Sequence, residues 1–471
     1  MIVDSTGTRA RLRSLSYLAA LAGGALAAAA ALLACSDDGE SPRTPFEEDA
    51  APAPSLPEAG APTDGAVVDA RGPFDPRDEA VTCDASPCVT QIVAGDGHFC
   101  ARIADGTVRC WGDDALGQLG RPEEADAGAG PSRAADVQGV TQISAAGATT
   151  CARVDDGGVF CWGGNANGEL GRDLDPPFDD EAHPIPERVA IDAAARVDVG
   201  PRSVCATTSA GAVYCWGNDE SAQLARGEPQ LEPGAPGPAA LGVTAKRTGA
   251  GVDTGFALTT DGALLTWGAV AGPAGVLAGR VSSVTPTPLP SSVQRLTNVT
   301  SFAVSGTTPG AIPPDALPWE PPPPPNQHAC AVMNGDAYCW GKSERGALGS
   351  GLPDPVVPLP TLARLGTRAY AQQIAAGGET TCVRLTDGNV ACTGENARGQ
   401  LGNGAVGPFA SSFTAATTLS GRAVQVAVAK ETVCALLQGG TVSCWGGNAH
   451  GELGLGSRDD DAHPSAAKIT F

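Results

Sequence analysis

A short motif with two cysteines ten positions apart recurs along the chain and constrains its fold more than any other feature. The first copy reads CARIADGTVRCWG, and a variant copy, FALTTDGALLTWG, keeps the frame but lacks both cysteines. A segment that returns at a regular interval predicts a repeat architecture, in which each copy is one supersecondary unit. The seven copies begin at Cys100, Cys151, Cys205, Phe256, Cys330, Cys382 and Cys434.

The interval between copies indicates the kind of repeat. Successive copies lie 51, 54, 51, 74, 52 and 52 residues apart. A period near 50 built of strand-like segments is typical of a β-propeller with one four-stranded blade per repeat. Glycine and proline, with 62 and 39 residues, suit many short strands joined by tight turns. The sequence therefore predicts an all-β, seven-bladed β-propeller over residues 89–471, built from seven repeats of about 51 residues.

Each motif has the properties of a β-hairpin. In the first copy, Ala104-Asp105-Gly106 is expected to form a three-residue loop with left-handed glycine, which places Cys100 opposite Cys110. In the fifth copy the cysteines are nine positions apart and the loop shortens to a two-residue Asn-Gly turn, so they face each other again. Facing residues of antiparallel strands lie at a distance that a disulfide can span. We therefore expect six hairpin disulfides: Cys100–Cys110, Cys151–Cys161, Cys205–Cys215, Cys330–Cys339, Cys382–Cys392 and Cys434–Cys444.

The remaining cysteines complete the count. The six pairs use 12 of the 15 cysteines. Cys35 is the expected lipidation site, for the reasons given in the next paragraph, and Cys83 and Cys88 are left to pair in the short loop 81–88. No free thiol remains, which indicates an oxidising compartment. Metal binding is the alternative, but pairs on six separate blades cannot converge on one ion, so we expect no metal site.

Residues 1–34 have the properties of an export signal. Three arginines precede the apolar run LSYLAALAGGALAAAAALLAC, which is the order of regions in a secretory signal. The run ends in LLAC, which resembles a bacterial lipobox; that resemblance implies cleavage before Cys35 and lipidation of this residue. An uncleaved transmembrane anchor is the alternative, since the run is long enough to span a bilayer. We favour a lipoprotein on the extracytoplasmic side of the bacterial cell envelope.

Residues 35–80 are rich in proline, alanine and acidic side chains and have no apolar period. Such a segment cannot bury enough surface to offset its chain entropy, so we expect a disordered tether. The tether would hold the folded part away from the membrane surface.

The full frame of the repeat, hxxIxAGxxHxCAxxxDGxVxCWGxNxxGQLG, resembles the regulator of chromosome condensation repeat, which builds seven-bladed propellers. His98 and His328 match its histidine, and Thr393 departs from its tryptophan. The resemblance implies that a terminal strand closes the ring, and we expect Pro464–Phe471 to complete the first blade beside Val89–Gly95. The disulfides resemble those of exported bacterial members. The matching tryptophans are Trp111, Trp162, Trp216, Trp267, Trp340 and Trp445.

No motif points to catalysis or to a nucleic acid. The chain has no GxSxG, HExxH or phosphate-binding loop, so we expect neither an enzyme nor a cofactor. Its net charge of −22 repels a phosphate backbone, which disfavours nucleic-acid partners.

Two similar acidic segments, DDEAHP and DDDAHP, end in His183-Pro184 and His463-Pro464. One interpretation of these segments is that their carboxylates bind a cation weakly. We favour the alternative, a solvated acidic turn before a strand that begins with proline. The carboxylates concerned are Asp179, Asp180 and Glu181 in the first segment and Asp459, Asp460 and Asp461 in the second.

The interval of 74 residues contains an insertion at 306–325, GTTPGAIPPDALPWEPPPPP. Polyproline is stiff and extended, so Trp319, near Pro321 and Pro325, would stand as a rigid aromatic anchor for a partner. A tolerated surface insertion is the favoured alternative, since loops accept added length at low cost.

These features together predict a non-enzymatic, membrane-tethered module that binds an extracytoplasmic protein or ligand and acts as a monomer. The family resemblance also admits guanine-nucleotide exchange on a small GTPase, although an export signal disfavours a cytosolic partner. A purely architectural envelope protein is the third possibility.

Overall fold

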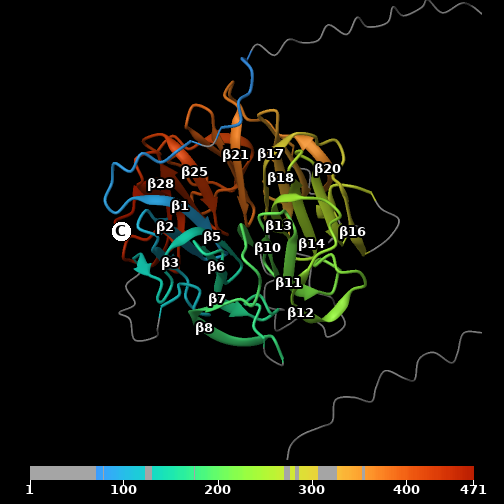
Figure 1. The fold of residues 1–471 in the computed structure, drawn as a ribbon. Helices are drawn as coiled ribbons and strands as arrows, with labels where there is room; N and C mark the ends of the chain where they lie inside the picture. Colours follow the sequence, from blue (N-terminus) through green and yellow to red (C-terminus); the bar gives the residue numbers. More distant parts are fainter. Residues whose placement is uncertain are drawn as a thin grey trace, which may run out of the picture. The chain divides into compact units, whose positions relative to one another are not determined.

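The computed structural model describes residues 71–77, 79–121, 130–173, 176–269, 276–281, 286–305, 326–352 and 356–471. The chain divides into two units, Met1–Val68 and Asp69–Phe471, and all described residues belong to the second. In this second unit, seven four-stranded antiparallel sheets follow one another round a ring (Figure 1). The predicted all-β, seven-bladed propeller is confirmed. Among the described residues, no helix is long and apolar enough to cross a membrane.

Each blade consists of four strands that are consecutive in the chain. Blades 1 to 3 are β1 Val89–Ala94, β2 His98–Ile103, β3 Val108–Gly112, β4 Ser132–Arg133; β5 Val140–Ala146, β6 Thr149–Val154, β7 Val159–Asn165, β8 Asp179–Arg188; and β9 Arg196–Val199, β10 Ser203–Thr207, β11 Val213–Asp219, β12 Gln230–Pro238. Blades 4 and 5 are β13 Ala245–Ala250, β14 Thr254–Thr259, β15 Leu264–Gly268, β16 Thr287–Ser292, with the 3₁₀ turn η1 Val276–Ala278; and β17 Val299–Val304, β18 His328–Met333, β19 Asp336–Lys342, β20 Val356–Leu362. Blades 6 and 7 are β21 Ala371–Gly377, β22 Thr380–Leu385, β23 Val390–Glu395, β24 Phe409–Ala415; and β25 Ala423–Val428, β26 Thr432–Leu437, β27 Val442–Asn448, β28 Asp459–Lys468.

The hairpin between the second and third strands has the two turn types that the sequence predicts. In blade 1, Gly106 has a φ of 80°, and Cys100 lies opposite Cys110. In blade 5, Asn334 and Gly335 have φ values of 54° and 83°, as a two-residue turn requires, and Cys330 lies opposite Cys339. The one-residue difference in spacing is therefore absorbed in the loop, and the register of the strands is unchanged.

Six tryptophans join neighbouring blades, and each side chain is fully buried. Each indole Nε1 donates a hydrogen bond of 2.7–2.9 Å to a carbonyl in the loop between the third and fourth strands of the preceding blade. In blade 6, where Thr393 stands in place of tryptophan, its Oγ1 donates to the carbonyl of Gly346 at 2.9 Å. The six donor–acceptor pairs are Trp111–Glu452, Trp162–Gln118, Trp216–Glu169, Trp267–Gln223, Trp340–Leu277 and Trp445–Gln400.

Glutamines on the first strands form a second set of contacts between blades. The Gln91 amide donates to the carbonyl of Ile143 at 2.8 Å and accepts from the Ile143 N–H at 3.0 Å. The same two-point contact joins blade 2 to 3, blade 6 to 7 and blade 7 to 1. These further pairs are Gln142–Val197, Gln373–Val426 and Gln425–Ile92.

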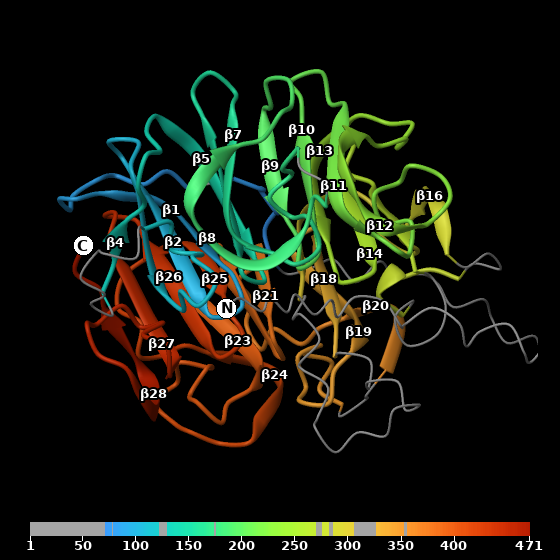
Figure 2. The ribbon, with the colours of Figure 1, turned by 90° about the horizontal axis from the view of Figure 1, so that it is seen from below.

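The expectation that Pro464–Phe471 completes the first blade is wrong. Strand β28 is the fourth strand of blade 7, where Lys468 pairs with Ser443 on β27. The chain enters the ring on the first strand of blade 1, so each repeat supplies all four strands of its own blade and none is left over. The contacts of Trp111 and Gln425 described above close the ring instead, together with backbone hydrogen bonds such as that from Lys430 N–H to the Asp96 carbonyl at 2.9 Å. Both views place β1 beside β25 (Figures 1 and 2).

Candidate functional site

The facing cysteines of six blades are joined by disulfides between the second and third strands. Their Cα atoms are 4.1 Å apart in every case. Cys83 and Cys88 form a seventh disulfide before the first blade, with Cα atoms 5.2 Å apart. In blade 4 the same register position holds Phe256 opposite Thr266. The cross-links and the contacts between blades together make the ring a braced scaffold, on which a site can be held rigidly.

The first strands of the blades line a central cavity with a volume of about 250 Å³. One position of each first strand lies beside the first strand of the next blade and is occupied by glutamine in four blades. In blades 3, 4 and 5 it holds Arg196, Arg247 and Ser301 instead. The cavity therefore has one sector that differs chemically from the rest.

A carboxylate replaces the missing glutamine contact between blades 3 and 4. Asp198 accepts hydrogen bonds from the Thr248 N–H and hydroxyl at 2.9 and 3.0 Å, and its other oxygen accepts from Arg196 Nε at 2.7 Å. The Arg247 guanidinium lies over the ring of Phe302, 4.4 Å from its centroid. Burial, with the nearby Arg196 charge, lowers the pKa of Arg247 to about 10.

Residues 71–77 and 79–88, here called the N-terminal strap, lie along one face of the ring. Arg71 pairs at 2.9 Å with Asp336, the first residue of β19 after the β18–β19 turn of blade 5. Glu79 pairs with Arg422, just before blade 7, and with Arg384 at 3.6 Å. Farther along the strap, backbone N–H groups donate hydrogen bonds to carbonyls of the β26–β27 turn, as Ala85 does to Gly439 at 3.0 Å.

The predicted tether therefore extends too far toward the propeller. The described part of its last ten residues, 71–77 and 79–80, packs against blades 5, 6 and 7. Its partners lie 265 to 343 residues away in the chain, so its local composition does not show them.

The two frame histidines are buried and join blades. His98 Nε2 lies 2.8 Å from the hydroxyl of Thr150, and His328 Nε2 lies 2.6 Å from that of Thr381. Burial lowers the pKa of each imidazole to about 4. A neutral ring enclosed by neighbouring blades serves as a structural contact.

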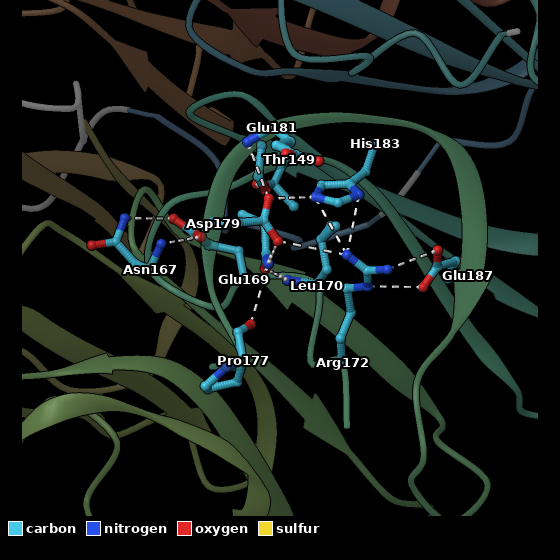
Figure 3. A network of polar contacts seen from close by, with 12 residues as sticks. Thr149, Asn167, Glu169, Leu170, Arg172, Pro177, Asp179, Glu181, His183 and Glu187 are labelled. Atoms are coloured by element: carbon cyan, nitrogen blue, oxygen red, sulfur yellow. Dashed lines mark hydrogen bonds and ion pairs between the residues drawn. The ribbon is translucent and has the colours of Figure 1, made fainter. Parts of the chain in front are cut away.

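The two acidic segments form matching side-chain pairs at the start of outer strands, and not in turns. His183 Nε2 lies 2.7 Å from Asp179 on β8, and His463 Nε2 lies 2.7 Å from Asp459 on β28. Figure 3 shows Arg172 between His183 and Glu187, with its Nε 3.0 Å from the Glu187 carboxylate. In the part of the chain that the structure describes, no group of three or more His, Cys, Asp or Glu side chains could hold a metal ion.

Comparison with known proteins agrees with this geometry. Models of the regulator of chromosome condensation (RCC1) repeat match residues 89–118, 140–169, 371–400 and 334–384. The ultraviolet-B receptor UVR8 of Arabidopsis thaliana is 30% identical over 386 residues, which make up 79% of this chain and 80% of the receptor. The chain belongs to the RCC1 repeat family. A shorter match, 30% identical over 138 residues, covers 29% of this chain and 13% of the human probable E3 ubiquitin-protein ligase HERC3.

Solved structures show the same RCC1 fold. Prp20p of Saccharomyces cerevisiae superimposes with a TM-score of 0.63 at 18% identity, over 84% of this chain and 88% of that one. Human WBSCR16 gives a TM-score of 0.59 at 20% identity, over 73% of this chain and 85% of that one. At these identities the likeness is one of fold.

Several predicted site residues of this RCC1 repeat protein lie outside the described residues. These are the export signal 1–34, the lipidation site Cys35, and the insertion 306–325 with Trp319, Pro321 and Pro325. The residues on either side of the insertion, Ser305 and Asn326, are described, and the insertion joins β17 to β18 in blade 5.

Sequence reasoning missed the cavity arginines and the N-terminal strap. Aligning the RCC1 repeats on their first strands, VTQI, VTQI, AARV, AKRT, VTSF, AQQI and AVQV, would have shown Arg196 and Arg247 at a glutamine position. The strap offers no such periodic signal.

Proposed function

We propose that this protein is a non-enzymatic, membrane-tethered binding module of the bacterial cell envelope, which contacts an extracytoplasmic protein with one face of its ring. The observation that carries the proposal is the course of the N-terminal strap. It occupies the face that holds the turns between second and third strands, here called the turn face, at blades 5 to 7. The opposite face, here called the loop face, is therefore the better candidate for a partner.

The loop face carries the connections between first and second strands and between third and fourth strands, because alternate connections of a four-stranded meander lie at opposite ends. The insertion 306–325 joins a first strand to a second strand, so the residues that flank it, Ser305 and Asn326, lie on this face. We infer that Trp319, flanked by stiff proline segments, is the anchor that a partner contacts. A broad face of loops on a rigid scaffold suits protein recognition.

Export and lipidation at Cys35 are parts of the same proposal. Supporting them are the charged and apolar regions of residues 1–34 and the pairing of all 14 other cysteines in disulfides. Disulfides persist outside the cytoplasm and are rare inside it. With 52 acidic against 30 basic side chains, the module is expected to take no nucleic acid, and we propose that it acts as a monomer without cofactor.

The test is a capture experiment with the full chain on envelope vesicles. The wild type is compared with three variants: a deletion of residues 306–325, Trp319→Ala, and Leu231→Ala as a control. Leu231 is 89% exposed on the outer strand β12, so the control also removes an exposed apolar side chain. A partner that the wild type and the control retain, and that the other two lose, supports the loop face.

Other outcomes favour other functions. Equal retention by all four forms would place the site elsewhere on the ring, and retention by none would favour the architectural alternative. Capture of a small GTPase whose bound nucleotide the protein releases would favour the exchange-factor alternative.

A further inference from the structure

The central cavity carries more positive than negative charge, in contrast to the chain as a whole. Three cationic side chains line it, Arg196, Arg247 and Lys430, against two acidic ones, Asp96 and Asp198. The chain has 30 basic and 52 acidic side chains in total. Arg196 is 35% exposed and Lys430 is exposed, whereas the Nε atom of Arg247 is buried, so Arg247 is the cation that solvent screens least and that attracts an anion most strongly.

The arginines stand where the repeat elsewhere has a structural residue. At this position, glutamines in four blades each make a two-point contact with the next blade. Arg196 and Arg247 lie on the neighbouring strands β9 and β13, and neither makes that contact with the next strand. Two adjacent repeats thus have guanidinium groups that line the cavity where other repeats have glutamine, and Asp198 joins blade 3 to blade 4 in place of that glutamine.

In this sector the Nε donor of Arg247 has no hydrogen-bond acceptor among the described residues. Asp198 already accepts from Arg196 and twice from Thr248. Arg247 Nε is buried and has no hydrogen-bond partner among the described residues, while its guanidinium lies over Phe302. A buried donor of this kind costs free energy unless a bound group accepts from it.

We propose that the sector of the central cavity at blades 3 and 4 binds a small oxyanion, a carboxylate, phosphate or sulfate group, on Arg247 and Arg196. Guanidinium groups match such oxygens with directed, charge-assisted hydrogen bonds. The volume of about 250 Å³ is below that of pockets for drug-sized ligands, so the ligand is a small molecule. This site is independent of the loop face proposed above.

Isothermal titration of the full-length protein tests the proposal, with sodium phosphate, sulfate and acetate as separate probes at constant ionic strength in chloride. Arg247→Gln restores the residue that four repeats carry here, so the fold is expected to persist. We expect saturable binding of at least one probe to the wild type, weakened about tenfold or more in Arg247→Gln, as loss of a charge-assisted hydrogen bond implies.

Arg109→Gln on β3 is the matched control, since it makes the same change in charge away from the cavity. It is expected to bind like the wild type. Absence of saturable binding for all three probes, or equal weakening in both variants, would overturn the proposal. Protein capture by the loop face would be unaffected either way, so the two proposals fail separately.

Discussion

Trp111 Nε1 donates a hydrogen bond of 2.8 Å to the carbonyl of Glu452, which lies 341 residues later in the chain. This bond joins blade 1 to blade 7 by the same contact that joins other neighbouring blades. The ring is thus closed by a repeated side-chain contact, reinforced by Gln425 and Ile92, and no strand crosses between the two end blades.

Trp111→Phe keeps an aromatic ring and removes only the N–H donor. The carbonyl of Glu452 is then left buried and unpaired, so the free energy of unfolding should fall by about 1–3 kcal/mol. Urea unfolding with disulfides intact measures the loss, and hydrogen exchange should rise in blades 1 and 7. In the control Trp162→Phe, exchange should rise in blades 1 and 2 instead; an identical exchange pattern in both variants would contradict the contact scheme.

Burial holds the pKa of His98 and His328 at about 4, against 6.5 for an ordinary histidine. Because this pKa is lower in the folded state, the unfolded chain takes up the proton first as the pH falls. The free energy of unfolding is therefore unaffected by these histidines above pH 6.5 and decreases as the pH falls from 6.5 toward 4. Each histidine accounts for roughly 3 kcal/mol over that window. In the double variant His98→Thr/His328→Thr, both histidines are replaced by threonine, the residue that blade 2 has at the equivalent position, Thr149. This variant should flatten the profile of unfolding free energy against pH. Parallel profiles would show that these histidines do not titrate on unfolding.

The pair Cys382 and Cys392 braces blade 6, the blade that lacks the tryptophan. Replacing both by alanine should lower the free energy of unfolding by roughly 2–3 kcal/mol, since a short loop is no longer closed in the unfolded chain. Thermal and urea unfolding under oxidising conditions measure the change. An unchanged stability would mean that the disulfide is not formed in the isolated protein.

Glu79 attaches the N-terminal strap, and the hydrogen bond from Arg422 lowers the pKa of its carboxyl. Glu79→Gln removes the charge, so we expect faster hydrogen exchange in residues 79–88 and little change in the blades. Glu232→Gln on the outer strand β12 is the control and should leave the strap unaffected. Increased exchange spread over the blades would show that the strap is part of the core.

Sequence reasoning succeeded where the structure is periodic. The two cysteines and the Asp-Gly or Asn-Gly turn fix the hairpin register locally, and seven copies then define the ring. It failed for Pro464–Phe471, because a strand sequence does not specify which of two neighbouring sheets it joins. It also missed contacts between distant residues, such as Arg71 with Asp336, because neither residue belongs to a repeated pattern.

For the candidate sites too, the sequence predicts what belongs to the repeat and misses what depends on contacts between blades. The buried positions of His98 and His328 could be inferred from their place in the repeat frame. The cavity sector could not, because it depends on the cavity-facing position of Arg247, on Phe302 beneath it and on Asp198 already being occupied. These relationships arise only when blades 3, 4 and 5 are side by side.

Peptide mapping of the protein isolated from its own cell envelope, without reduction, tests the central claim most directly. We predict seven disulfides, each within one hairpin or within the Cys83–Cys88 loop, no free thiol, and a lipid-modified peptide that begins at Cys35. Free cysteines in a chain recovered from the cytosol, with residues 1–34 still attached, would contradict an exported binding module and favour the exchange-factor alternative.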